Sequence, residues 1–346
     1  MPERFKGEMP ARSVWFTAPR TVELRHASAL PPSRGQVRIE ALFSGISHGT
    51  EMLAYRGECP RSLSLDSALP TLQGDFNFPI NYAYASVGRI VDTGSEAGDF
   101  VEGDLVFAFN PHQSCYTIPI TEVIKLPGEL DPRIGVFVAN FETAVNALLD
   151  AAPRLGDRVV VIGQGVVGLM ITHLARRAGA SLVVTSDPHE KRRQLSQAAG
   201  ADLVLNPATE SLHERISALT LGAGADVVIE ASGQPHALND AIEAAGVEGR
   251  VVVVSWYGTK RADLALGSDF HRKRLTLKSS QVSSLDPSLS ARWSIVRRRE
   301  LAVRYLSELS LGEWISHVLP FDRAAEAYRL IDERPAEIVQ VVLKYK

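Results

Sequence analysis

The glycine-rich segment at residues 163–168 constrains the fold of this 346-residue chain more than any other feature. It reads Gly-Gln-Gly-Val-Val-Gly and directly follows the apolar run Val-Val-Val-Ile at 159–162. The stretch that follows, 167–178, has the amphipathic pattern of a helix. A Gly-x-Gly-x-x-Gly pattern that joins a strand to a helix is typical of a dinucleotide-binding fold. We therefore predict a doubly wound, parallel α/β sheet around this segment.

Each glycine of the segment has a physical task in such a fold. Gly163 permits a tight turn, Gly165 lets the backbone approach a pyrophosphate, and Gly168 lets the helix pack against the sheet. The helix N-terminus then offers N–H groups to the phosphates. We predict cofactor contacts from six consecutive residues: Gly163, Gln164, Gly165, Val166, Val167 and Gly168.

A second strand, predicted at 181–186, ends in Ser186 and Asp187, which lies 19 residues after Gly168. A carboxylate at this place accepts hydrogen bonds from the ribose and repels a 2′-phosphate. Nearby basic residues, Arg192 among them, would instead neutralise such a phosphate. We predict that Ser186, Asp187 and Arg192 contact the cofactor, and that NAD(H) is favoured over NADP(H).

Further apolar runs at 226–231 and 250–255 are predicted to be buried parallel strands, and 275–281 to continue the sheet. Ligands bind at the carboxyl ends of such strands. The residues there that we expect to contact the cofactor are Ala231, Ser232, Ser255 and Trp256.

The two flanking parts of the chain have a different pattern. Between 13 and 126, short β-like runs alternate with turns; within 36–43, Val37, Ile39 and Ala41 alternate with polar residues, as in a half-buried strand. The last part is predicted to hold helices at 292–309 and 323–333 and a strand at 338–343.

Composition excludes several classes of protein. The net charge of −3 gives no general attraction to nucleic acid or anionic membranes, and no run approaches the roughly 18 apolar residues that span a bilayer. The N-terminus lacks the apolar core of a secretory signal. Two cysteines, Cys59 and Cys115, exclude a disulfide framework and a four-cysteine zinc site. We expect a cytoplasmic protein with no nucleic-acid or membrane partner.

Three segments resemble landmarks of the medium-chain dehydrogenase/reductase superfamily: Ser-Gly-Ile-Ser-His-Gly-Thr-Glu at 44–51, Gly-Asp-Leu-Val-Phe at 103–107, and Asp-Val-Val-Ile-Glu-Ala-Ser-Gly at 226–233. The resemblance implies an α/β plus β fold, in which a GroES-like β-rich catalytic domain carries an inserted Rossmann domain. The implied boundaries are 1–140 for the catalytic domain, 141–285 for the Rossmann domain and 286–346 for a return to the catalytic domain.

Four segments (45–51, 81–88, 270–275 and 280–282) are similar to one branch of that superfamily. This branch includes the dehydrogenase that oxidises the hydroxyethyl group of bacteriochlorophyllide.

At the positions where zinc-dependent relatives hold their catalytic metal, the chain carries His48, Tyr84 followed by Ala85, and Ala139. A catalytic zinc needs about three protein ligands, and one histidine does not supply them. Cys115 also stands alone where the family's structural zinc lobe would be. The resemblance therefore predicts an enzyme without zinc.

Without a metal, side chains have to handle the alcohol proton. His48 is the first candidate because imidazole titrates near neutral pH, and Tyr84 is the second because a phenol can donate to a carbonyl oxygen. Thr50 matches a hydroxyl that relays the proton in relatives, and His112 is predicted to line the substrate site. The alternative for each is structural: a capping or surface histidine, or a tyrosine packed in the β-rich core.

Thr143 matches a segment that lies beside the nicotinamide in relatives, and Glu142 is a candidate helix cap. The basic runs at 272–274 and 297–299 could hold an anionic substrate; contacts with acidic residues or a solvated helix face are the favoured interpretation.

The sequence thus predicts a zinc-independent, NAD(P)(H)-dependent alcohol dehydrogenase or ketone reductase that acts on a small molecule, and relatives suggest a homodimer. Two alternatives stay open: a zinc-free enoyl or quinone reductase, and a dinucleotide-binding protein that has lost its chemistry.

Overall fold

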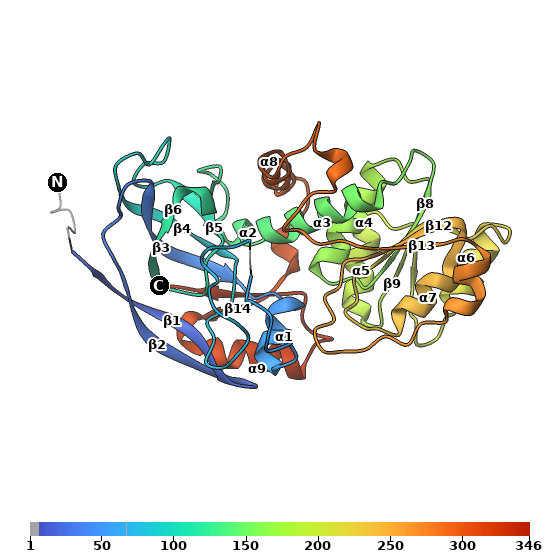
Figure 1. Ribbon diagram of the computed structural model, residues 1–346, viewed down its shortest axis with the longest axis horizontal. Helices are drawn as coiled ribbons and strands as arrows, with labels where there is room; N and C mark the ends of the chain where they lie inside the picture. Colours follow the sequence, from blue (N-terminus) through green and yellow to red (C-terminus); the bar gives the residue numbers. More distant parts are fainter. Residues whose placement is uncertain (1–6, 67) are drawn as a thin grey trace. The chain divides into compact units, whose positions relative to one another are not determined.

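The structure, a computed structural model, describes residues 7–66 and 68–346. The chain forms two compact units: Met1–Ala139 together with Ser310–Lys346, and Asn140–Leu309. Figure 1 shows the course of the chain by colour. The expected boundary at 285/286 lies earlier than the observed boundary between Leu309 and Ser310. Helix α8 (Ile295–Tyr305) stays with the second unit because it forms an ion pair with helix α3 (Val138–Ala151).

The second unit is built on a six-stranded sheet with the order β10-β9-β8-β11-β12-β13, in which every pairing is parallel. This order is that of a doubly wound dinucleotide-binding sheet, as predicted. The strands are β8 (Arg158–Ile162), β9 (Leu182–Ser186), β10 (Leu203–Leu205), β11 (Ala225–Glu230), β12 (Ala245–Val253) and β13 (Thr276–Ser279).

Helices cover both faces of this sheet, which explains its apolar strands. Helix α4 contacts β8, β9 and α5, whereas α7 contacts β11, β12 and α6. In β8 every residue after Arg158 is buried. The bounds of these helices are α4 (Val166–Arg177), α5 (Glu190–Ala198), α6 (Leu212–Leu219) and α7 (Ala237–Ala244).

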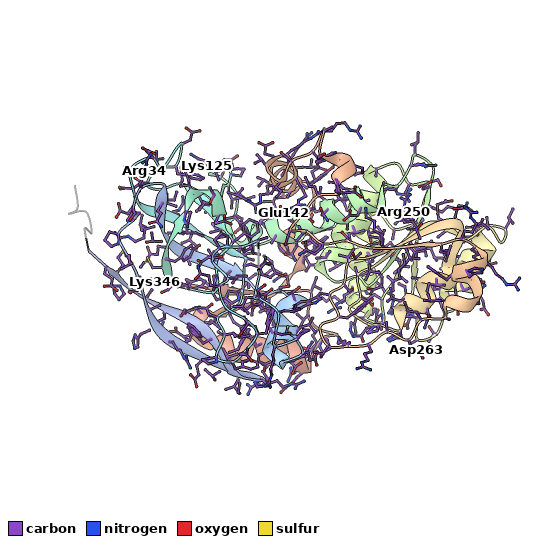
Figure 2. The ribbon with its side chains drawn as sticks, in the orientation of Figure 1. Arg34, Lys125, Glu142, Arg250, Asp263 and Lys346 are labelled. Carbon is purple, nitrogen blue, oxygen red and sulfur yellow. The ribbon has the colours of Figure 1, made fainter. Side chains whose placement is uncertain are left out.

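Polar side chains also join helices to strands in this unit. Arg250 of β12, labelled in Figure 2, donates hydrogen bonds to the carbonyl oxygens of Ala151 and Ala152 at the end of α3. A cation at a helix C-terminus satisfies carbonyl groups that the helix leaves unpaired.

The first unit holds a mixed seven-stranded sheet with the order β14-β15-β3-β4-β5-β7, in which β6 also pairs with β3, and a separate hairpin of β1 and β2. The last strands and α9 come from the C-terminal segment. The bounds are β1 (Met9–Ala18), β2 (Thr21–Ala29), β3 (Gln36–Gly45), α1 (Thr50–Arg56), β4 (Ser86–Thr93), β5 (Leu105–Ala108), β6 (Cys115–Pro119), β7 (Val123–Lys125), α2 (Pro132–Gly135), β14 (Ile315–Pro320), α9 (Ala324–Glu333) and β15 (Gln340–Lys344).

Strand β3 departs from the predicted alternation at Arg38, which is only 1% exposed. Its guanidinium donates to Asp92 Oδ2 at 2.7 Å and to the carbonyl oxygen of Gly7 at 2.7 Å. A buried cation is tolerated where a carboxylate and a carbonyl satisfy it. The sequence pattern, which records only polarity, placed this side chain on the solvent face.

Among the helices that the structure describes, none is long and apolar enough to cross a bilayer.

Candidate active site

The glycine-rich loop joins β8 to α4, and two of its glycines are required by the backbone. Gly163 has a φ of +90°, and a Cβ there would lie 2.5 Å from the Cα of Ser232. A Cβ on Gly168 would lie 1.9 Å from the carbonyl oxygen of Gly163. Gly165 differs, because its φ is −68° and no described atom lies within 4 Å of a Cβ built there.

Gly165 is therefore not a glycine that the folded protein needs for its own packing. It is the N-cap residue of α4, so the N–H groups of Val166 and Val167 have no carbonyl partner within the helix. A bare backbone beside free N–H groups suits the close approach of an anion such as a pyrophosphate.

Gln164 turns its side chain into the protein. The side chain is fully buried, and Oε1 accepts the Thr172 hydroxyl at 3.0 Å. Its main-chain N–H donates to Asp187 Oδ2 at 2.7 Å. Gln164 thus holds the loop to the end of β9 and does not present its amide to a ligand.

Asp187, which is 2% exposed, links the loop to the start of α5. Its Oδ1 accepts the N–H of His189 at 2.8 Å, and Arg192 Nη1 lies 3.9 Å from Oδ2. Arg193 instead donates to the carbonyl oxygens of Asp187 and Pro188. Each carboxylate oxygen still has capacity for a second donor. The buried Ser186 precedes this group, so the structure brings the predicted Ser186, Asp187 and Arg192 together.

Glu230 organises the carboxyl ends of β11 and β12. Its Oε1 accepts the N–H and the hydroxyl of Ser232 at 2.7 and 2.5 Å, and its Oε2 accepts the Tyr257 hydroxyl at 2.6 Å. Ser255 Oγ accepts the N–H of Gly233 at 2.8 Å. The predicted Ser232 and Ser255 are thereby held in neighbouring loops. Sequence reasoning missed the organising role of Glu230, although the Ile-Glu-Ala-Ser-Gly segment contained it.

The remaining predicted contacts of this unit lie on the same elements. Ala231 donates its N–H to the carbonyl oxygen of Ile162 at 2.8 Å, next to the glycine-rich loop. Trp256 and Thr143 are half-buried, the first after β12 and the second on α3.

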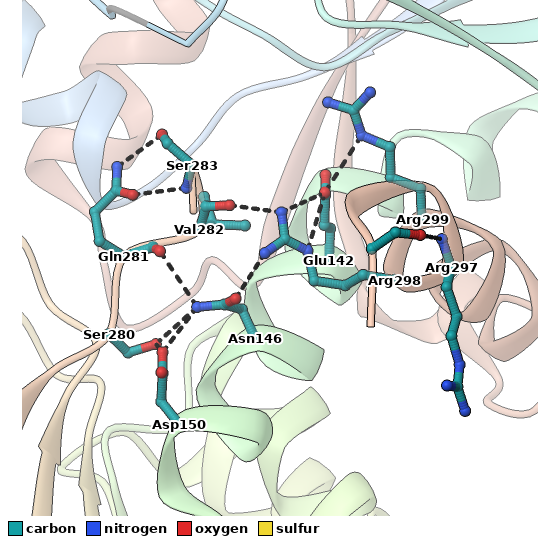
Figure 3. Close-up of polar contacts among 11 residues, drawn as sticks. Glu142, Asn146, Asp150, Ser280, Gln281, Val282, Ser283, Arg297, Arg298 and Arg299 are labelled. Atoms are coloured by element: carbon teal, nitrogen blue, oxygen red, sulfur yellow. Dashed lines mark hydrogen bonds and ion pairs between the residues drawn. The ribbon is translucent and has the colours of Figure 1, made fainter. Parts of the chain in front are cut away.

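Glu142 does not cap a helix, because α3 begins at Val138 and Glu142 lies in its second turn. Its carboxylate is buried and accepts hydrogen bonds from Arg298 at 2.8 Å and Arg299 at 3.3 Å (Figure 3). These contacts agree with the favoured interpretation of the basic run at 297–299, in which its arginines contact acidic residues.

In the first unit, three residues of interest lie in the turn between β3 and α1 and at the first position of α1. Ser47, His48 and Thr50 are half-buried, and so is Tyr84, whose hydroxyl donates to Ser47 Oγ at 2.7 Å. Desolvation raises the pKa of Tyr84 to about 12, and hydrogen bonds with Ser47 and Thr50 oppose the shift. Tyr84 therefore keeps its proton at neutral pH and can act as a hydrogen-bond donor.

His112 lies behind this turn and is 1% exposed. Its Nδ1 lies 2.7 Å from Ser44 Oγ, and its Nε2 lies 3.0 Å from Glu51 Oε1. A carboxylate only accepts, so the pattern assigns the proton to Nε2 and lets Nδ1 accept the Ser44 hydroxyl. Because both ring nitrogens are hydrogen-bonded, His112 supports Ser44 and Glu51 in the structure. Its contact with substrate stays a prediction.

The Glu51 carboxylate, also 1% exposed, is the centre of this buried cluster. Its Oε1 accepts the Tyr328 hydroxyl in addition to His112, and its Oε2 accepts the N–H of Ser47 at 3.1 Å. The Ser44 hydroxyl is 2.9 Å from that of Tyr345. The C-terminal segment thus fixes the turn that carries His48. The sequence signal for this cluster was a glutamate directly before the apolar run Met-Leu-Ala-Tyr at 52–55.

The expected zinc positions carry His48, Tyr84 and Ala139. His48 supplies one imidazole, Tyr84 is hydrogen-bonded to Ser47, and Ala139 offers only a methyl group. Over residues 7–66 and 68–346, no three or more His, Cys, Asp or Glu side chains are grouped to hold a metal ion.

Comparison with known proteins agrees with this architecture. A family model described as zinc-binding dehydrogenase matches residues 166–297. D-guloside 3-dehydrogenase of Escherichia coli strain K12 is 28% identical over 94% of this chain and 97% of its own length. The 2-desacetyl-2-hydroxyethyl bacteriochlorophyllide A dehydrogenase of Cereibacter sphaeroides is 25% identical over 98% of this chain and 99% of its own length. A crystal structure of an oxidoreductase of unknown specificity from Escherichia coli shares the fold, with a TM-score of 0.82 and 19% identity. The match covers 98% of this chain and 100% of that chain.

These likenesses together support the medium-chain dehydrogenase/reductase superfamily for this chain. It is an enzyme of the oxidoreductase class. The predicted combination of a GroES-like and a Rossmann fold is confirmed, whereas the assignment to the bacteriochlorophyllide dehydrogenase-like branch stays a prediction.

Two glycine variants separate binding from folding in this enzyme. Gly165→Ala should leave thermal stability unchanged and weaken NADH binding at least tenfold, about 1.4 kcal/mol, because its methyl group enters open space where a pyrophosphate would lie. Gly168→Ala should lower the stability by about 1–3 kcal/mol through overpacking. Thermal unfolding and NADH fluorescence titration measure the two effects, and unchanged NADH affinity in Gly165→Ala would contradict the assignment.

Glu51→Ala should destabilise the first unit by about 3–5 kcal/mol, because it leaves the buried His112 and Tyr328 donors without their acceptor. Glu40→Ala is the control, since Glu40 pairs with the exposed Lys346 and such surface pairs contribute about 0–1 kcal/mol. Urea unfolding measures both variants. Equal midpoints for the two would show that the cluster does not stabilise the fold.

Proposed function

We propose that the protein is a zinc-independent, NAD(P)(H)-dependent dehydrogenase that interconverts a secondary alcohol and a ketone of a small metabolite. One observation carries the proposal. The positions that would bind zinc hold His48 and Tyr84, and Tyr84 is hydrogen-bonded to Ser47 beside Thr50. This set offers donors and acceptors for a proton but no ligand set for a metal.

The second unit supplies the residues for the cofactor. Main-chain N–H groups at the start of α4 would hold the pyrophosphate, and Asp187 would accept a ribose hydroxyl. Ser232, Ser255 and Trp256 would line the nicotinamide half at the ends of β11 and β12. The bound cofactor would supply the hydride donor or acceptor.

We further propose that NAD(H) is the preferred cofactor. The buried Asp187 carboxylate would repel a 2′-phosphate. Arg193 is committed to two main-chain carbonyls, and Arg192 already lies beside Asp187. Neither guanidinium is therefore fully available for a phosphate.

The first unit supplies the proton chemistry. Tyr84, protonated at neutral pH, would turn its single O–H from Ser47 Oγ to the substrate oxygen, and His48 would take the alcohol proton or return it to the ketone. The Thr50 hydroxyl, hydrogen-bonded to Tyr84, extends this set. The names of the relatives, D-guloside 3-dehydrogenase and the dehydrogenase of a hydroxyethyl side chain, support an alcohol as the substrate.

A reducing, cytoplasmic location goes with this proposal. Cys59 and Cys115 are free, buried thiols, and burial raises the pKa of Cys59 to about 12 and that of Cys115 to about 11. Neither is arranged to act as a thiolate at neutral pH.

The function is tested by a substrate screen that follows the absorbance of reduced nicotinamide with NAD and NADP side by side. The panel contains glycosides, sugar acids, simple secondary alcohols and enones. Turnover of a saturated secondary alcohol, faster with NAD, supports the proposal. Turnover of enones alone would identify an enoyl or quinone reductase, and NADH binding without any turnover would identify an inactive dinucleotide-binding protein.

His48→Ala should lower kcat by roughly 10²–10⁴-fold, as expected for loss of a general acid–base group. Tyr84→Phe should also lower kcat. Tyr116→Phe is a matched control, because Tyr116 likewise donates to a serine, Ser86, at 2.8 Å but lies buried in the sheet. If Tyr84→Phe lowers kcat and His48→Ala does not, Tyr84 is the acid–base residue. A wild-type kcat in both His48→Ala and Tyr84→Phe would refute a role of either side chain in proton transfer.

We also propose a homodimer formed through β13. This strand is the last in the sheet order, and Thr276, Leu277 and Ser279 on it are exposed. An exposed edge strand is a template for pairing with a second chain. Sedimentation analysis should show a dimer at micromolar concentration that Leu277→Asp dissociates, whereas a monomeric wild-type protein would contradict this prediction.

A further inference from the structure

Arg298 is a charged side chain that is buried against α3 and the segment after β13. The residue lies on α8, is 1% exposed, and donates to acceptors on two other segments (Figure 3). Its Nη2 donates to Glu142 Oε1 at 2.8 Å and to the carbonyl oxygen of Val282 at 2.5 Å, and its Nη1 donates to Asn146 Oδ1 at 2.6 Å. One guanidinium therefore connects α8, α3 and the segment that follows β13.

Asn146 holds the same segment from a second side. Its Nδ2 donates to the carbonyl oxygen of Gln281 at 3.3 Å and to Ser280 Oγ at 3.2 Å. The Ser280 hydroxyl and Asn146 Nδ2 both donate to Asp150 Oδ2, at 2.7 and 2.9 Å. The carbonyls of two consecutive residues, Gln281 and Val282, are thus fixed by the side chains of Asn146 and Arg298.

The segment at 280–283 continues directly from β13, at the carboxyl edge of the parallel sheet where ligands of such folds bind. The N–H of Ser280 donates to the carbonyl oxygen of Val253 at 2.8 Å, two residues before Ser255. Residues 281–283 are exposed or half-buried, so packing gives them little support. Their position depends mainly on the polar contacts just described.

A buried ion pair is weak evidence for stability, because well-packed apolar residues can stabilise a fold as well or better. What an apolar side chain cannot do is hold a main-chain carbonyl at a defined place. The contacts of Arg298 with Glu142, Asn146 and Val282 therefore fit a positioning role better than a purely stabilising one.

We propose that Arg298 is a positioning residue of the cofactor site: with Glu142 and Asn146 it fixes the 280–283 segment so that this segment can hold the nicotinamide end of the dinucleotide. The inference rests on the proposed function of the enzyme. It gives Arg298, in the basic run at 297–299, a role in positioning the 280–283 segment in place of a role in binding an anionic substrate.

The test compares Arg298→Met with Arg38→Met. Arg38 is a matched control, since it is equally buried and pairs with Asp92 and a main-chain carbonyl, but in the first unit. Arg298→Lys serves if the methionine variant does not fold. Binding of NADH and of ADP-ribose is titrated, together with the fluorescence enhancement of bound NADH, which reports the surroundings of the nicotinamide.

Both Arg298 variants should lose the NADH fluorescence enhancement and bind NADH more weakly, while the Kd of ADP-ribose stays within about twofold of wild type. The kcat at saturating cofactor should fall by up to about 10²-fold, as expected for a misplaced reacting group. Arg38→Met should change none of these in the folded protein. Equal loss of ADP-ribose affinity, or wild-type NADH fluorescence and kcat, would overturn the inference. Failure of wild-type protein to bind NADH would instead refute the proposed function.

Discussion

The hydrogen-bonded, buried carboxylate of Glu51 is the constraint on which the first unit of this enzyme depends. A carboxylate at 1% exposure is tolerated only when donors satisfy it, and here two come from distant parts of the chain and one from the adjacent turn. His112 approaches from the loop after β5, Tyr328 from α9, and the N–H of Ser47 from the turn that carries His48. Because these donors must meet, the C-terminal segment has to return to the first unit, and the turn has one defined position.

Much of the fold could be predicted from the sequence because its signals are local. The glycine-rich loop and the apolar runs identified β8, β9 and β11 and the parallel sheet, and the backbone around Gly163 and Gly168 explains why those glycines are needed. The clusters around Glu51, Glu230 and Arg298 could not be predicted in the same way. Their partners are separated by up to 277 residues along the chain, and a sequence pattern does not say which buried charge meets which donor.

The same limit explains the partial outcome for the candidate site. The predicted Thr50 and Tyr84 do come together, with Ser47 beside them, because β3 and β4 pair and bring the turn next to residue 84. His112, also proposed for the substrate, has both ring nitrogens engaged behind the turn. Polarity alone placed Arg38 on the solvent face and Glu142 at a helix end, whereas paired charges allow both to be buried.

The central claim is that side chains, and not a metal, handle the proton. Neither Cys59 nor Cys115 lies at an expected ligand position, and Tyr84 is bonded to Ser47 where zinc ligands would stand. The most direct measurement is the metal content of protein that turns over its best alcohol substrate, with kcat determined before and after chelation. The account predicts far less than one zinc per chain and an unchanged kcat. About one zinc per chain, with activity lost on chelation and restored by zinc, would contradict it.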